Sequence, residues 1–291
     1  GLRRRSRPAR QVGPRARVAQ VVLLTVAAVL VGMVAELALV SGLEHRSAQV
    51  TLFNQFRNEV ALGTGPLGPV GPDHRPLAPG TPIAYLVIPS IDLRQVVLEG
   101  TSSGVLAEGP GHLRSTVFPG GDGTSVVLGR SHLFGGPFAR IGQLQKGATV
   151  DVLTGAGIQA TFRVVDVHRG GARVLGPVPG TSRLALGTAT GPPFAPTGVL
   201  WVDADKVGRA LPSFRPIVGS VSADEQPLGT DAGHLWLLLL GLEVLIGVLA
   251  LAAWSWRVRG RAQTWIVFTA PVLLVAVLVA DQLARLLPNL T

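Results

Sequence analysis

Three long apolar runs interrupt an otherwise mixed pattern of hydrophobic and polar positions. They cover residues 18–40, 235–256 and 264–287, and each is more than 20 residues long. About 20 apolar residues are enough for a helix to cross the hydrocarbon core of a membrane. We therefore predict three transmembrane helices, assigned to residues 18–41, 234–256 and 264–287.

Between the first two runs, short stretches rich in β-branched residues alternate with Gly, Pro, Asp and Ser. Seven such stretches predict strands at residues 83–88, 95–100, 125–129, 149–154, 160–168, 183–188 and 199–204. Many short strands with turn residues between them and little helix are typical of a closed or sandwiched all-β domain. We favour a closed barrel over residues 83–208.

The segments around this domain have their own patterns. Val50, Phe53, Phe56 and Val60 recur at helical spacing, which predicts a juxtamembrane amphipathic helix over residues 42–62. Residues 63–82 are too rich in Gly and Pro to hold a helix or a sheet ladder, and we interpret them as a linker. The remaining segments are a basic tail (1–17), a second linker (209–233), a short loop (257–263) and a tail (288–291).

The distribution of arginine predicts the orientation in the membrane. Ten arginines lie in the two segments beside the apolar runs, at positions 3, 4, 5, 7, 10, 15, 17, 257, 259 and 261, with no acidic residue among them. Basic residues are retained on the cytoplasmic side. We therefore expect a multi-pass protein of the cytoplasmic membrane with a cytoplasmic N-terminus, a cytoplasmic 257–263 loop, and the β domain and C-terminus outside.

The net charge of +9 does not indicate a nucleic-acid partner. Without those ten arginines, the chain has 16 basic and 17 acidic residues, so the rest of the chain is close to neutral. The chain has no cysteine, so disulfides and thiol chemistry are excluded. Four histidines (45, 74, 168 and 234) have no acidic or histidine partners at ligand spacing, and we expect neither a metal site nor a cofactor.

Two blocks within the β domain resemble the sortase family. They are "VIPSIDLRQVVLEGTSSGVLAEGPGHL" (87–113) and "GTSVVLGRSHLFGGPFARIGQLQKGATVDV" (123–152). The order of the blocks is most similar to class E-like members from actinobacteria, and abundant Ala, Gly and Val with only two lysines is consistent with such a source. The resemblance implies an eight-stranded closed barrel on a membrane-anchored cysteine transpeptidase.

In that family a cysteine thiolate attacks a threonine carbonyl in a sorting signal such as LPxTG, a histidine carries the proton, and an arginine holds the oxyanion or the substrate. Here Ala189 stands at the cysteine position, Arg130 at the histidine position and Gly198 at the arginine position. A methyl group forms no thioester, and a guanidinium accepts no proton at neutral pH. The resemblance therefore predicts a pseudoenzyme that acts as a binding or scaffold subunit of a cell-envelope complex.

An alternative keeps catalysis without a thiol. His132 could serve as the base for Thr188 or Thr190 in a hydrolase or transpeptidase, provided that an oxyanion donor is close by. In the pseudoenzyme interpretation, Arg130, His132, Thr188 and Ala189 instead line a groove for an extended peptide. The terminal "LLPNLT" faintly resembles a sorting signal without its glycine, which we attribute to composition.

Three acidic residues, Glu36, Glu243 and Asp281, lie in the outer half of the predicted spans. A carboxylate in lipid is costly unless it is compensated. Arg285, four residues after Asp281, could pair with it. We expect these three carboxylates to contact a partner, which would be another integral membrane or cell-envelope protein.

Overall fold

The computed structural model describes residues 14–35, 40–71, 74–170, 180–192, 195–216, 218–231, 233 and 235–291. The first 13 residues of the basic tail, Glu36 and His234 lie outside the described residues. The chain divides into two compact units. One holds Gly1–Glu36 and Trp236–Gln282, and the other holds Leu37–Leu235 together with Leu283–Thr291.

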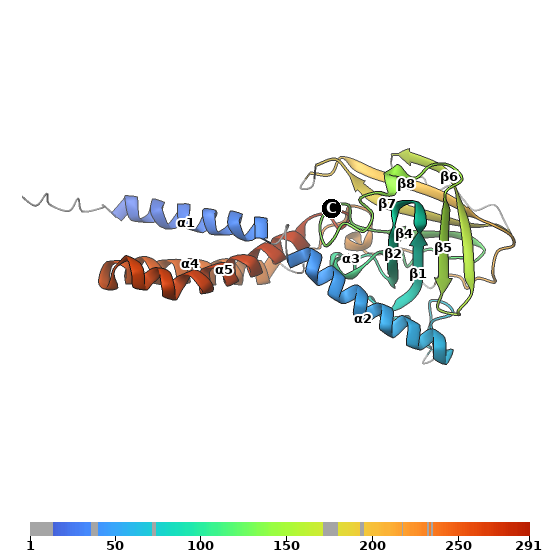
Figure 1. Cartoon of the computed structure of the whole chain (residues 1–291), viewed down its shortest axis with the longest axis horizontal. Helices are drawn as coiled ribbons and strands as arrows, with labels where there is room; N and C mark the ends of the chain where they lie inside the picture. Colours follow the sequence, from blue (N-terminus) through green and yellow to red (C-terminus); the bar gives the residue numbers. More distant parts are fainter. Residues whose placement is uncertain are drawn as a thin grey trace, which may run out of the picture. The chain divides into compact units, whose positions relative to one another are not determined.

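The larger unit is built on a closed β-barrel (Figure 1). Its strands are β1 (Pro82–Ile88), β2 (Leu93–Glu99), β3 (Gly111–His112), β4 (Gly123–Leu128), β5 (Thr149–Thr154), β6 (Gln159–Arg169), β7 (Ser182–Thr190) and β8 (Gly198–Lys206). They close in the order β1-β2-β3-β4-β7-β8-β6-β5. Most neighbours are antiparallel, whereas β2–β3 and β4–β7 are parallel. The predicted closed barrel of about eight strands is confirmed.

Side chains alternate across β7 and divide the apolar residues between two cores. Leu184 and Leu186 pack in the main core, which draws residues from seven strands and fills the barrel. Ala185 and Ala189 point to the opposite face of the strand and join a second core with Leu106 and Trp201. This period of two is what a β-strand imposes. The end of β7 therefore presents Ala189 to the outside of the barrel.

Seven of the strands coincide with the stretches that the sequence predicts, and β3 is the one that the prediction missed. Only Gly111 and His112 form it, and it pairs with Leu98–Glu99 on one side and Val127–Leu128 on the other. A two-residue strand has no hydrophobic periodicity of its own. The strand is recognisable only from its pairing with β2 and β4.

Helix α2 (Ser41–Leu62) occupies the region of the predicted juxtamembrane helix and packs against the barrel. Leu52 and Phe56 are buried against Val96 and Leu98 of β2 and Val105 of α3 (Ser103–Glu108). Gly63 ends α2 in the left-handed conformation, a common C-terminal cap.

The described residues of the two predicted linkers form isolated bridges but no strand, apart from Pro82 at the start of β1. Residues 63–81 hold an isolated bridge between Val70 and Pro76, and Leu211 of the second linker bridges to Gly121. The second linker also contains a short 3₁₀ helix, η4 (Ala223–Glu225).

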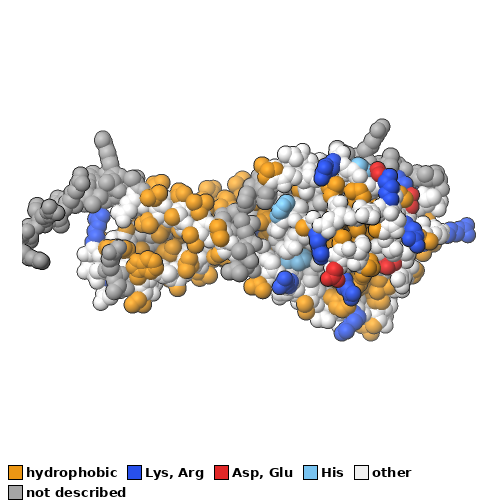
Figure 2. Space-filling view, turned by 45° about the horizontal axis from the view of Figure 1, so that its top comes forward, with side chains coloured by type: hydrophobic (Ala, Val, Ile, Leu, Met, Phe, Trp, Pro, Cys, Tyr) orange, Lys and Arg blue, Asp and Glu red, His pale blue; other side chains and the backbone are white. Residues whose placement is uncertain are grey.

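The smaller unit contains helix α1 (Pro14–Ala35), helix α4 (Leu235–Arg259) and most of helix α5 (Arg261–Leu286). Leu245 and Leu249 of α4 pack with Ala276 of α5, next to the half-buried Ala28 and Val29 of α1. In the face drawn in Figure 2, hydrophobic side chains cover most of this helical unit, whereas charged side chains gather on the barrel unit.

Among the described residues, two helices are long and apolar enough to cross a membrane, which corrects the prediction of three. They are Leu235–Arg259 and Gln263–Leu286. The apolar part of α1 is only Val22–Gly32, because Arg15, Arg17 and Gln20 occupy its first turns. The predicted span continues through residues 36–39, which lie outside the described residues.

Candidate functional site

The three positions at which the sequence departs from the sortase pattern lie at one end of three neighbouring strands. Arg130 follows the end of β4, Ala189 lies near the end of β7, and Gly198 begins β8. The parallel β4–β7 ladder pairs Leu128 with Gly187, and Gly129 N donates to Gly187 O at 3.0 Å. The antiparallel β7–β8 ladder pairs Thr190 with Gly198. The fold therefore brings together positions that lie far apart in the sequence.

Ala189 has an apolar environment. Its side chain is 8 % exposed and belongs to the outer core with Val199 and Trp201 of β8. The other members of this core are Leu106, Val126, Leu128, Ala185 and Leu290. Its methyl group carries neither a proton nor a lone pair that could react with a peptide. At this position the protein offers a contact surface without a nucleophile.

Arg130 is fully buried and is held by several groups. Its Nη2 donates to Ser103 O at 3.0 Å and to Ser103 Oγ at 2.7 Å, and Nη1 donates to Thr291 O at 3.4 Å. The guanidinium also lies over the ring of Phe134, 4.7 Å from its centroid. A buried charge requires such partners. The side chain joins α3, the loop after β4 and the end of the chain.

The last residues of the chain lie against this site, which the sequence prediction missed. Leu290 O accepts from Ser131 N at 2.9 Å and from Ser131 Oγ at 3.1 Å. Asn289 Nδ2 lies within 3.0 Å of the carbonyl oxygens of Thr101, Asp224 and Gln226. Thr291 N donates to Pro288 O, which closes a turn. The only sequence signal was the "LLPNLT" resemblance, which gives no indication of where the segment binds.

The alternative catalytic residues are not brought together. Thr188 Oγ1 donates to Gly129 O at 2.8 Å and is buried on the inner side of β7. Nδ1 of the exposed His132 bonds Ser131 Oγ at 2.7 Å. Thr190 is half-buried, and its carbonyl accepts from Thr197 N. In the part of the chain described here, no hydrogen bond joins His132 to either threonine.

Residues 86–206 match the family model of the sortase domain. The chain carries a domain of the sortase family. A search of curated proteins finds no match.

Solved sortases are similar to this chain over about half of its length. Sortase D5 of Clostridium perfringens is 19 % identical, with 56 % of this chain and 98 % of that chain covered and a TM-score of 0.45. Sortase A of Corynebacterium diphtheriae is also 19 % identical, with coverage of 66 % and 96 % and a TM-score of 0.42. Sortase E1 of Streptomyces coelicolor, solved with a tripeptide in its active site, is 25 % identical, with coverage of 46 % and 92 % and a TM-score of 0.39.

The buried charges of the sortase domain lie mostly in structural pairs. His112 Nδ1 bonds Glu99 Oε2 at 2.9 Å, and both side chains are buried. His168 Nε2 lies 3.3 Å from Asp203 Oδ2. Burial raises the pKa of the Asp203 carboxyl, against the opposing effect of His168. Burial likewise raises the pKa of Glu225, which lies next to the segment that Asn289 contacts. The two pairs join β2 to β3 and β6 to β8.

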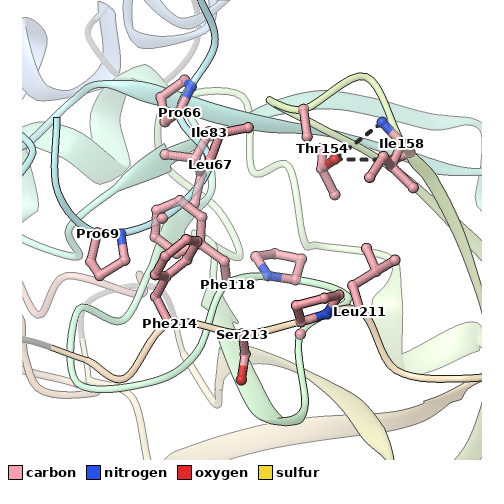
Figure 3. A pocket seen from close by; sticks show the side chains of 15 residues that line it. Pro66, Leu67, Pro69, Ile83, Phe118, Thr154, Ile158, Leu211, Ser213 and Phe214 are labelled. Atoms are coloured by element: carbon pink, nitrogen blue, oxygen red, sulfur yellow. Dashed lines mark hydrogen bonds between the residues drawn. The ribbon is translucent and has the colours of Figure 1, made fainter. Parts of the chain in front are cut away.

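A separate cavity of about 180 Å3 lies where the two linkers cross the barrel of the sortase domain (Figure 3). Pro66 and Leu67 of the first linker and Leu211 and Phe214 of the second line it, with Phe118 between them. It shares no residue with the site around Ala189. Its lining is mostly apolar, with the hydroxyl groups of Thr154 and Ser213 among it, and presents no acid–base pair, so we assign it no chemistry.

Among the acidic residues of the predicted spans, Glu243 is exposed on α4, and Asp281 is half-buried and bonded by Gln282 Nε2 at 3.0 Å. Arg285, expected to pair with Asp281, bonds Glu44 Oε1 of α2 at 2.7 Å. Within the described ranges, no group of three or more His, Asp and Glu side chains could hold a metal ion.

Proposed function

We propose that this protein is a catalytically inactive sortase-domain protein, anchored in the cytoplasmic membrane, that acts as a binding or scaffold subunit of a cell-envelope membrane complex. The proposal rests on the residues at two positions of the site. Ala189 stands at the nucleophile position, and a fully buried Arg130 stands at the base position. Neither side chain can perform the covalent step of a cysteine transpeptidase.

The engagement of Arg130 supports binding over catalysis. Its guanidinium is used in contacts with Ser103, Phe134 and Thr291. Because the Arg130 guanidinium is bonded to α3 and to Thr291, we assign it the role of shaping the predicted groove beside Ala189. Such a groove can still bind a peptide segment without cleaving it.

Membrane anchoring is supported by α4 and α5, both long and apolar. In our proposal the basic segment 257–263 faces the cytoplasm and the sortase domain lies outside; the predicted loop in this segment is reduced to Gly260, between α4 and α5. The exposed Glu243 on α4 is then the point at which a partner membrane protein packs, because a carboxylate facing lipid is costly.

Peptide turnover tests the inactive state. The full chain in detergent is incubated with LPxTG peptides beside a cysteine sortase as positive control. We expect no cleavage and no transpeptidation. Turnover that the wild type shows and a His132→Ala variant loses would establish the non-thiol enzyme with Thr188 or Thr190 instead.

Purification in mild detergent followed by mass spectrometry tests the partner. We expect a stoichiometric membrane protein with the wild type, and its loss with Glu243→Leu. Val244→Leu changes the neighbouring exposed position without a charge and should retain the partner. Recovery of the wild type as a clean monomer would contradict the scaffold role.

A further inference from the structure

The segment Pro288–Thr291 behaves like a bound ligand of the sortase domain. Asn289 and Leu290 are fully buried, and Thr291 is nearly so. Residues of this segment hydrogen-bond to groups 65 to 188 positions away in the sequence, which indicates a shaped receiving site.

Apolar contact defines one half of this site. The Leu290 side chain enters the outer core that contains Ala189, between β4, β7 and β8. Full burial of a leucine side chain contributes about 1.5–3 kcal/mol relative to leaving it in water. Leu290 therefore belongs to the same apolar core as the position at which the family pattern would place its nucleophile.

Hydrogen bonds define the other half. Ser131 donates from both its backbone N and its Oγ to Leu290 O, and Arg130 donates to Thr291 O. On the other side of the turn, Asn289 N donates to Gly229 O, and its side-chain amide faces the three carbonyls of Thr101, Asp224 and Gln226. Backbone recognition of this kind holds a peptide in a fixed register.

We propose that the groove beside Ala189 is a peptide-binding site whose resident ligand is the chain's own Pro288–Thr291 turn. The inference rests on the proposed function, because it assigns a ligand to a groove that has lost its chemistry. An external peptide reaches Ala189 only in competition with this turn. The geometry also gives Arg130 a role: it recognises a main-chain carbonyl of the ligand at the position where the family has its histidine.

Thiol labelling tests this occupancy, because the native chain contains no cysteine. Ala189→Cys is placed in the full chain and in a chain that stops after Leu287, and both are treated with a maleimide in detergent. We expect labelling at least tenfold faster without residues 288–291. Val165→Cys, exposed on β6, should react equally fast in both chains.

Rescue by a peptide in trans gives the specific control. A synthetic acetyl-LLPNLT should restore slow labelling of the Ala189→Cys variant in the shortened chain, whereas LLPNDT, with an aspartate at the Leu290 position, should not. Equal labelling of the introduced thiol with and without the segment, or equal effects of the two peptides, would overturn the proposal.

A second variant keeps the test decisive if the shortened chain fails to fold. Leu290→Cys in the intact chain should label at least tenfold more slowly than Val165→Cys, and an equal rate would overturn the proposal.

The two proposals can fail separately, because labelling reports occupancy and turnover reports chemistry. Cleavage of LPxTG peptides by the wild type, together with slow labelling of the Ala189→Cys variant, would remove the inactive state alone. Fast labelling of that variant in the full chain, without cleavage by the wild type, would remove the cis ligand alone.

Discussion

At the scale of single residues, close packing behind the site leaves no room for larger side chains. Gly187 lies on β7 between Leu128 and Trp201, two positions before Ala189. A Cβ at this glycine would lie 2.7 Å from Leu128 Cδ2 and 2.7 Å from Trp201 Cζ3. The glycine is therefore required by its neighbours and not by a turn.

We predict that Gly187→Ala destabilises the barrel by about 1–3 kcal/mol, because overpacking forces the Trp201 ring or the strand to shift. Thermal unfolding of the full chain in detergent, followed by near-UV circular dichroism, should show a lower Tm. Gly104→Ala is the matched control, since nothing lies within 4 Å of its added Cβ and alanine favours its helix. A Tm for Gly187→Ala equal to that of the wild type would contradict the packing argument.

Individual site residues could be predicted from the sequence only where a motif fixes the register. The Gly136-Pro137-Phe138 motif aligns Arg130, and the end of a predicted strand aligns Ala189. Ser103 and Leu290 could not be found this way, because they reach Arg130 or Ser131 only through tertiary contacts across 27 and 159 positions. The bond between Arg285 and Glu44 could not be found either, because the two residues lie 241 positions apart.

At the scale of elements, helix α2 is held on the barrel by apolar residues and by one buried histidine. Nε2 of His45 lies 3.0 Å from Gln95 Oε1 on β2, and its Nδ1 lies 3.4 Å from Ala107 O on α3. Burial lowers the pKa of His45, opposed by these two hydrogen bonds, and the nearby Arg46 lowers it further. The docked helix therefore favours the neutral imidazole.

This shift predicts a loss of stability on acidification. The unfolded chain has the ordinary histidine pKa of about 6.5. As the pH falls below that value, the unfolded state binds a proton that the folded state does not, so stability decreases until the lowered native pKa is reached. Well above the unfolded-state pKa of about 6.5, His45 is neutral in both the folded and the unfolded state, so it contributes no pH dependence of stability. Tm profiles between about pH 5 and 8 should be steeper for the wild type than for His45→Gln, and identical profiles would contradict the prediction.

The elements themselves were largely predictable, because their periodicities are local. Strands β1, β2 and β4 to β8 carry enough β-branched residues between turn signals to be recognised. β3 is too short for any pattern. Barrel closure was favoured from the many short strands, whereas the count of eight came from the family resemblance.

At the scale of the whole molecule, the arginine distribution predicts which parts face the cytoplasm. Gln263 lies in the first turn of α5, within the basic segment 257–263, and Val165 lies on β6 of the barrel. A single cysteine at either position is unique in this chain. An impermeant maleimide on intact cells should label Val165→Cys and leave Gln263→Cys unlabelled until the membrane is opened. The reverse pattern would show that the orientation is inverted.

The division into a helical unit and a barrel unit could be predicted from composition, whereas the placement of the chain end could not. Residues 283–291 belong to the barrel unit although they include the end of the last apolar helix and all that follows it. A composition shift marks where a span ends, but it contains no information about which distant carbonyls will accept a hydrogen bond from Asn289.

The contact between Arg130 and Thr291 also sets an order of events during synthesis. Residues 82–206 leave the ribosome before either of the last two helices, and domains generally fold as units while synthesis continues. The barrel can therefore form with its Ala189 surface still open, and that surface is covered only after α5 has been made. The Ala189 surface is thus covered only once the last helix has been made. A chain that is stalled or clipped before Pro288 would therefore expose an apolar surface, which quality-control proteases and chaperones can recognise.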